Sequence, residues 1–410
     1  MRTTHRIRHR IGMAIALAAC LLPAARAGGI DAAPPETKAA RESRFEMGAD
    51  GIEVRAHEGE FRLRINGKLH LDSVRHDADR SSLEDDFGVR RARVTLKMDL
   101  SKRWSSKSQF EFSDSEVELK DLYVRFSPTK RIGATFGQSK EPFSLEQLTG
   151  SDDLTFIERA LPVDALAPGR ALGASLRKSS KHTSITAGIF NGPVVLRGGI
   201  PKEDEGLSAS ARGTWAPVST KGRVVHFGLS VGSRQFREGA EPRFRFRPES
   251  SLTDVRFVNT GRIEGIEDLD RVGFEVVGAR GPLSLQSEYI RTRLKRPLEN
   301  FGTIEMSGWY ANLSWVFRGK PRSYESEDGT FGGVTGRKRG PTWEIAARIS
   351  NLDLDDANIE GGQETNVTIG LNWSPRPNLR LMTNYVRVHS ERRERRDRPS
   401  ILLARLQLTF

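Results

Sequence analysis

Cysteine is almost absent from this sequence, since Cys20 is the only one among 410 residues. A lone thiol cannot close a disulfide within the chain, so the fold must be stabilised in another way. The eight histidines are scattered, and neither a CxxC nor an HExxH motif occurs. Because metal sites need clustered sulfur and nitrogen ligands, we expect no metal and no cofactor.

Long apolar runs are also scarce. Hydrophobic residues make up 37% of the chain and the mean hydropathy is −0.50. Beyond residue 27 no run of apolar residues is long enough for a membrane-spanning helix. A closed β-barrel is still compatible with this composition, because barrel strands alternate apolar and polar residues and so keep the mean hydropathy low.

The N-terminus has the three parts of a secretory signal peptide. Arginines precede an apolar run at 11–22, and the small-residue sequence Ala25-Arg26-Ala27 follows. This order predicts cleavage after Ala27. A lipoprotein signal is the alternative, because the sequence LAAC that ends at Cys20 has the shape of a lipobox.

Cleavage would leave an exported chain without cysteine. The full chain carries 65 Lys and Arg against 53 Asp and Glu, a formal net charge of +12; five of the basic residues and none of the acidic ones lie in residues 1–27, so the mature chain carries +7. Residues 28–60 are rich in Ala, Pro and charged residues, and they predict a short, poorly ordered periplasmic arm.

From Phe61 the sequence alternates with a period of two. In FRLRINGKLHLD apolar residues occupy one parity and mostly basic residues the other, and RRARVTLKMD and DLYVRF repeat the pattern. Such alternation predicts β-strands with one apolar and one strongly charged face. The polar parity supplies candidates for a lumen wall, namely Arg62, Arg64, Arg93, Lys97 and Arg125.

The pattern predicts sixteen strands, an even number as a single-chain barrel requires. They fall near 61–72, 88–100, 104–113, 119–127, 131–138, 170–178, 182–190, 206–216, 223–233, 270–280, 282–292, 304–318, 341–350, 364–374, 378–390 and 400–410. Short turns alternate with longer connections at 139–169, 234–269 and 319–340. We therefore expect an all-β, antiparallel transmembrane barrel over 61–410, with short turns at one rim and long loops at the other.

Aromatic residues support a membrane barrel. Tyr and Trp occur near the predicted strand ends, as interfacial girdles require. The last strand, SILLARLQLTF, is amphipathic and ends on Phe410. A terminal Phe on such a strand resembles the C-terminal signature of bacterial outer-membrane proteins, which is typical of recognition by the barrel-assembly machinery.

The segment EPRFRFRPES places arginines at 243, 245 and 247 with phenylalanines between them. In a strand, residues two apart share a face and lie ~7 Å apart, so the guanidinium groups would form a row. Like charges in a row repel unless water or anions lie beside them. A solvated loop with chance alternation is the alternative interpretation.

The chain resembles the phosphate-selective porin O/P family of Gram-negative outer membranes from about Phe61 to Phe410. The resemblance is carried by FGVRRARVTLK, GQSKEPFSLEQLTGSDDLTFIERALP, RFRFRPESSLTDVRFVNTG, GWYANLSWVF and TIGLNWSPRPNLRLMTNYVRV. It implies a sixteen-stranded barrel embedded in outer-membrane lipid, a homotrimer, and an inward loop that narrows the pore for small anions such as phosphate.

The resemblance also implies roles for individual residues. Anion-contacting or constriction positions correspond to Arg90, Arg91, Asp121, Ser151 and Arg159, and an arginine ladder at the extracellular mouth corresponds to Arg243, Arg245 and Arg247. The sequence departs from the best-known members at Gly150, where they carry a second serine, and Asp152 and Asp153 add negative charge nearby. These departures weaken the expectation of tight phosphate selectivity and leave a general anion preference.

The predicted inward loop, 139–169, could instead be an external loop. It contains seven large apolar residues, which favours burial against the barrel wall. The chain as a whole has three alternative functions. They are a porin for another solute such as an organic anion, an outer-membrane hydrolase, for which no Ser–His motif is visible, and a secreted nucleic-acid binder, for which no motif is visible.

Overall fold

The structure is a computed structural model that describes residues 44–48, 51–56, 61–113, 116–194, 205–220, 222–296, 302–334 and 340–410. The predicted signal peptide, residues 1–27, and Cys20 lie outside the described residues. No helix in the described part of the chain is long and apolar enough to span a membrane.

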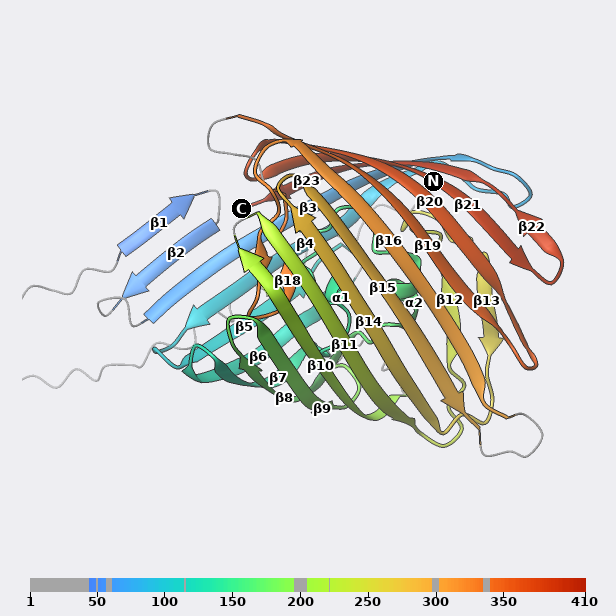
Figure 1. Cartoon of the computed structure of the whole chain (residues 1–410), viewed down its shortest axis with the longest axis horizontal. Coiled ribbons are helices and arrows are strands. Elements are labelled where there is room, and N and C mark those ends of the chain that lie inside the picture. The colour runs from blue at the N-terminus through green and yellow to red at the C-terminus, as the bar shows by residue number, and fades with distance from the viewer. Residues whose placement is uncertain are drawn as a thin grey trace, which may run out of the picture. The chain divides into compact units, whose positions relative to one another are not determined.

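Sixteen antiparallel strands close into a barrel (Figure 1). In chain order they are β3 (Phe61–Asp77), β4 (Asp86–Asp99), β5 (Trp104–Glu111), β6 (Glu118–Thr129), β7 (Ile132–Lys140), β8 (Arg170–Ser179), β9 (Thr183–Phe190), β10 (Glu205–Thr220), β11 (Arg223–Phe236), β14 (Asp268–Arg280), β15 (Leu283–Lys295), β16 (Ile304–Arg318), β19 (Thr342–Asp356), β20 (Ile359–Arg376), β21 (Leu379–Arg392) and β23 (Ser400–Thr409). The last strand pairs with the first, from Ser400 opposite Asp77 to Thr409 opposite Lys68. Each of the sixteen predicted strands corresponds to one of these, which confirms the predicted fold class.

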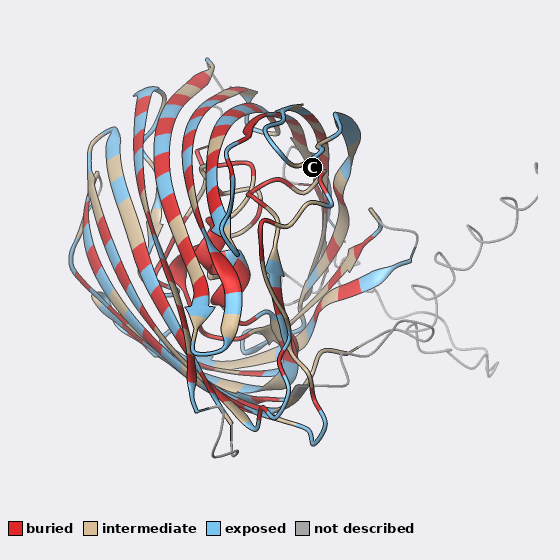
Figure 2. Ribbon diagram, turned by 90° about the vertical axis from the view of Figure 1, so that its right-hand side faces the viewer, coloured by how far each residue is buried: buried red, intermediate tan, exposed pale blue. Residues whose placement is uncertain are grey.

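Burial alternates along many of the barrel strands, as the stripes in Figure 2 show. On β21, Leu381 and Tyr385 are 38% and 46% exposed, whereas Met382 and Val386 are 3% and 1% exposed. Successive side chains of a strand point to opposite faces, so one set meets lipid and the other fills the interior. The sequence period of two is therefore the inside–outside pattern of the barrel.

Aromatic side chains gather where the outward faces of neighbouring strands approach one rim. Trp343 and Trp373 stack with ring centroids 5.5 Å apart, and Phe317 lies 6.3 Å from Trp343. Rings with an apolar body and a polar edge prefer the boundary between hydrocarbon and water. This cluster belongs to the interfacial girdle expected from the sequence.

Connections differ between the two rims. One rim has the long loop 141–169, which carries α1 (Leu145–Leu148) and α2 (Leu161–Leu166), and the loop 237–267, which carries β12 (Arg243–Phe246) and β13 (Val258–Arg262). The other rim has short turns, and by the usual asymmetry it is periplasmic.

One long connection does not follow this rule. Residues 319–341 join β16 to β19 and carry β17 (Tyr324–Glu325) and β18 (Thr330–Phe331). Because the strands alternate in direction, this connection lies at the rim of short turns. The prediction that all long connections share one rim is therefore wrong for 319–341, which we call the inner-rim loop.

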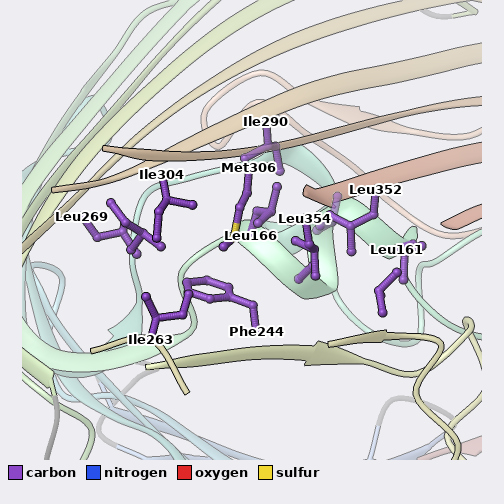
Figure 3. Packing of buried hydrophobic residues seen from close by; sticks show 14 of the residues in the cluster. Leu161, Leu166, Phe244, Ile263, Leu269, Ile290, Ile304, Met306, Leu352 and Leu354 are labelled. Atoms are coloured by element: carbon purple, nitrogen blue, oxygen red, sulfur yellow. The ribbon is translucent and has the colours of Figure 1, made fainter. Parts of the chain in front are cut away.

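The interior of the barrel contains an apolar core as well as polar groups. Leu161 and Leu166 of α2 pack with Phe244 of β12 and with inward residues of the wall such as Ile290 and Leu352 (Figure 3). The long loops therefore fold into the lumen, where their apolar side chains are removed from water. This packing holds the long loops against the inner face of the barrel wall.

The segment predicted as a poorly ordered arm contains regular structure. β1 (Arg44–Gly48) pairs with β2 (Gly51–Ala56), and β2 pairs with the start of β3, Ala56 opposite Phe61. β3 extends beyond the end of β23, so its free backbone edge there is available to β2. The expectation of disorder is wrong for residues 44–56.

Candidate constriction site

A cavity of about 500 Å³ lies inside the barrel between the wall and two inward loops. Its basic lining residues are Lys68, Arg91, Arg93, Lys97, Lys107, Arg125, Lys140, Arg159, Arg170, Arg177 and Arg212. Its acidic lining residues are Asp121, Asp153, Glu325 and Asp328. Eleven basic residues and four acidic residues line the cavity, so its lining carries an excess of positive charge.

Loop 141–169 forms one side of this cavity, and we call it the constriction loop. Phe143, Leu145, Phe156 and Ile157 are at most 1% exposed, and Leu148 alone among the seven apolar residues singled out in the sequence is only half-buried. The prediction that the loop folds back against the wall is confirmed.

One carboxylate of the wall and one of the loop 237–267 fix the helices of the constriction loop. Glu288 of β15 accepts hydrogen bonds from the backbone N–H groups of Leu145 (3.1 Å) and Glu146 (2.8 Å) at the start of α1. Glu249 accepts one from Leu161 at the start of α2, at 2.9 Å. The first N–H groups of a helix lack partners within the helix, so these carboxylates satisfy them.

Arg159 lies at the other end of α1. Its guanidinium donates to the carbonyl oxygens of Glu146 (3.1 Å) and Thr149 (2.9 Å). Lys140 of β7 donates to the carbonyl oxygens of Leu148 (3.3 Å) and Thr149 (3.2 Å). Both cations line the cavity, and their charged groups donate to the carbonyl oxygens at the C-terminal end of α1.

Arg90 and Arg91 meet the constriction loop at Glu158. Arg90 forms a bidentate pair with that carboxylate, at 2.8 and 3.0 Å, and Arg91 lies 3.7 Å from it. Burial alone would raise the pKa of Glu158, but the charges of Arg90, Arg91 and Arg405 hold it well below its usual range. Of the two predicted constriction arginines, Arg91 lines the cavity, whereas Arg90 is absent from its described lining.

Asp121 links two more cations on the wall. Its carboxylate accepts from Lys107 and from Arg170, each at 2.5 Å. The three side chains come from β6, β5 and β8 and all line the cavity. An acid placed between two cations orients both of them toward the pore and lowers their mutual repulsion.

Ser151 and the two aspartates after it lie at the tip of the constriction loop. Lys68 of β3 forms an ion pair with Asp152, and its ammonium lies 3.5 Å from the hydroxyl of Ser151. Burial alone would raise the pKa of Asp152, but the charge of Lys68 lowers it below the usual value. The negative charge of Asp152 is thus neutralised locally instead of facing the pathway.

Asp153 connects the constriction loop to the inner-rim loop. Its carboxylate accepts from the backbone N–H of Gly333 at 2.8 Å, and its carbonyl accepts from Arg322 at 3.0 Å. Burial raises the pKa of Asp153, and the neighbouring charge of Asp152 raises it further. Asp152 and Asp153 therefore both serve as loop contacts.

The lumen-wall candidates divide into two groups. Arg93, Lys97 and Arg125 line the cavity. Arg62 and Arg64 lie toward the periplasmic end of β3, within 3.8 and 3.4 Å of Asp99, and do not belong to the described lining of the cavity.

The arginine row lies in the loop 237–267, apart from the cavity. Arg243 and Arg245 are exposed on one side of β12, while Phe244 on the other side is 7% exposed. Arg247 follows the strand and donates to the carbonyl of Thr253 and to Asp254. The strand geometry expected from the sequence thus holds for the first two arginines and ends before the third.

Several cavity residues were not singled out from the sequence. They are Lys68, Lys107, Lys140, Arg170, Arg177 and Arg212. Strand parity could have indicated Lys68 and Lys107, which share the polar face with residues that were chosen. Alternation along a strand shows which face a residue lies on, but it does not show the position of the residue along the barrel axis. This position decides whether the residue lines the cavity.

Comparisons with known proteins agree with this geometry. The family model for phosphate-selective porin O and P matches residues 63–410. Porin O of Pseudomonas aeruginosa is 23% identical over 385 residues, covering 83% of this chain and 86% of that protein. An uncharacterized protein of Caulobacter vibrioides is 26% identical over 359 residues, covering 80% of this chain and 68% of that protein.

Solved structures share the fold at low sequence identity. The anion-selective porin of Comamonas acidovorans has a TM-score of 0.56 at 11% identity, covering 86% of this chain and all of that one. A trimer form of OmpT of Vibrio cholerae has a TM-score of 0.54 at 9% identity, covering 85% and 99%. With a family match that spans nearly the whole barrel, the chain belongs to the phosphate-selective porin O and P family.

Proposed function

We propose that the protein is an outer-membrane porin through which small anions, phosphate and similar oxyanions among them, diffuse passively. The observation that carries the proposal is the excess of eleven basic over four acidic side chains around the lumen cavity. Fixed cations in a narrow, low-dielectric passage focus their field on the pathway and raise the local anion concentration.

The spacing of the cations supports passage rather than tight binding. Arg64, Lys97 and Lys107 lie directly opposite one another across β3, β4 and β5. Like charges placed opposite each other destabilise a sheet. A row of partly hydrated cations can be kept for transient anion binding, because conduction requires sites that also release the ion.

Phosphate fits the chemistry of the site. Arginine presents a planar fork of donors that binds oxyanions bidentately, and the hydroxyl of Ser151 adds a neutral donor beside Lys68. An organic anion is the second candidate, supported by Tyr123 and Phe331 in the lining, which offer apolar surface. That the protein catalyses no reaction is part of the same proposal.

The test is electrical recording from the purified protein in planar bilayers. We expect the reversal potential across a KCl gradient to show anion selectivity, and phosphate to reduce chloride current by competing for the same cations. A cation-selective reversal potential would contradict the proposal. Chloride current that phosphate leaves unchanged, but an organic carboxylate reduces, would favour the second candidate.

We further propose that the barrel functions as a homotrimer. The short strands β5 to β9 expose apolar side chains, such as Leu176 at 67% and Ile189 at 59%, and membrane-facing surfaces of this kind can pack against a second copy. Chemical cross-linking in native membranes should give a trimer, and a monomer alone would contradict this assignment.

A further inference from the structure

The tip of the inner-rim loop places an acid against a cavity cation. The carboxylate of Asp328 pairs with the guanidinium of Arg177 on β8, and a carboxylate oxygen of Glu327 lies 4.0 Å from the same guanidinium. Arg177 and Asp328 both line the cavity. The side chain of Arg177 is 15% exposed and that of Asp328 is 51% exposed, so the acid covers the cation on its water side.

The position of this tip does not depend on the carboxylate of Asp328. Arg212 donates to the backbone carbonyls of Asp328 and Gly329, each at 2.8 Å, and Ser184 donates to the carbonyl of Glu327 at 2.7 Å. Arg212 is itself held by Glu275 at 2.8 and 2.7 Å. Backbone contacts thus fix the tip, so the carboxylate of Asp328 is not needed to hold the loop in place.

A carboxylate and a phosphate present similar acceptor oxygens to a guanidinium. We propose that the carboxylate of Asp328 competes with the permeating anion for Arg177 at the periplasmic side of the cavity. The anion is therefore not held at this side and can leave the cavity quickly. This inference rests on the proposed anion passage and assigns to the inner-rim loop the control of anion release.

The physical reason is the balance that a channel must keep. An uncovered arginine in a lining that also contains Lys107 and Arg125 would bind an oxyanion tightly and slow its exit. A tethered carboxylate competes at a fixed local concentration, so the anion is displaced without any change in the rest of the site. Release then stays fast while attraction by the other cations is retained.

The test compares Asp328→Asn with the parent in planar bilayers at increasing phosphate concentration. We expect phosphate to reduce chloride current at a lower concentration in the variant, with a fall in the half-blocking concentration on the order of fivefold, as loss of an exposed ion pair allows. Glu264→Gln is the matched control, since it removes an exposed carboxylate from the opposite rim and should leave the half-blocking concentration unchanged.

A double-mutant cycle gives the decisive comparison. In an Arg177→Gln background, Asp328→Asn should no longer alter the half-blocking concentration, because the competed cation is gone. An unchanged value in Asp328→Asn alone, or an equal shift in both backgrounds, overturns the inference. A cation-selective parent channel would instead overturn the proposed function, so the two failures are distinguishable.

Discussion

Single residues in this pore combine two tasks, holding a loop and carrying charge. Arg159 binds backbone carbonyls of the constriction loop and lines the cavity at the same time. Glu158 orders Arg90, Arg91 and Arg405 in one network. Changes at such positions should therefore alter selectivity and loop position together, and variants have to be chosen to separate the two.

Arg159→Glu should lower anion selectivity sharply, because it reverses a charge in the cavity lining and faces carbonyl oxygens with a carboxylate. A charge at 4 Å is worth ~4 kcal/mol at an effective dielectric of 20, and screening will reduce this figure. Arg159→Lys should retain most of the selectivity. Reversal potentials measure the effect, and heat-modifiable gel mobility checks folding; equal values in all three proteins would exclude Arg159 from the pathway.

Asp153 predicts a pH dependence of the current. Its raised pKa means that it takes up a proton in the acidic range above the usual carboxyl pKa of about 4. As the pH falls through this range the cavity loses a negative charge, so anion selectivity should rise. The raised pKa also means that the ionised form is disfavoured in the fold, so its contribution to stability falls as the pH rises through the same range.

Asp153→Asn should remove this step in selectivity and leave the parent's acidic value at every pH. Current–voltage curves recorded from neutral to acidic pH in a fixed KCl gradient measure it. A step of the same size in the variant would assign the titration to another group.

At the scale of elements, the loops rather than the strands build the pore. α1 is held by Glu288 of the wall and α2 by Glu249 of the loop 237–267, and the inner-rim loop meets the constriction loop through Asp153. The apolar core around α2 makes these loops rigid (Figure 3). The barrel provides a frame, and contacts between the loops fix the loop residues that line the cavity.

Glu288→Ala should loosen α1, because two backbone N–H groups would lose their acceptor in a buried place. An unsatisfied buried donor costs about 1–3 kcal/mol. We expect larger and noisier single-channel currents with unchanged barrel assembly. Thr292→Ala, at a buried inward position four residues further along β15, is the control and should leave the current steady.

The loop 237–267 carries its arginines on a surface that faces water. Replacing Arg243, Arg245 and Arg247 together by Ala should reduce anion current most at low salt, because exposed charges are screened over ~10 Å at 0.1 M and ~3 Å at 1 M. Conductance at both salt concentrations gives the measurement. Equal fractional losses would argue against attraction at the mouth.

At the scale of the whole molecule, closure joins the two ends of the barrel. Phe410 exchanges backbone hydrogen bonds with Gly67 at 2.8 and 3.0 Å, and a Cβ at Gly67 would lie 1.9 Å from the Phe410 ring. A glycine is therefore required where the terminal ring lies against β3. The C-terminal aromatic thus has a structural role in closure in addition to any role in assembly.

Export defines the mature chain, which we predict to begin at Gly28. The positive start, apolar run and small-residue end before this position are those of a cleaved signal. N-terminal sequencing of protein purified from outer membranes should read GGIDAAPP. A lipidated Cys20 at the start of the mature protein would show that the lipoprotein alternative is correct.

The sequence by itself determined the barrel. The period of two shows which side chains face lipid, because successive side chains of a strand point to opposite faces. The number of alternating segments gives the number of strands. The burial of the constriction loop also followed from its local content of Phe, Leu and Ile. The hairpin at 44–56 was not predicted, since its pairing depends on the free edge that β3 leaves beyond β23.

The tertiary structure decided which charges meet. Glu158 contacts Arg405 across 247 residues of sequence, and Asp153 meets Gly333 across 180. Local periodicity cannot show such partners, because loop paths inside the lumen are set by packing against distant strands. The rim of the connection 319–341 follows from the alternating direction of the strands. Only the tertiary structure showed that an acid of this connection, Asp328, covers Arg177.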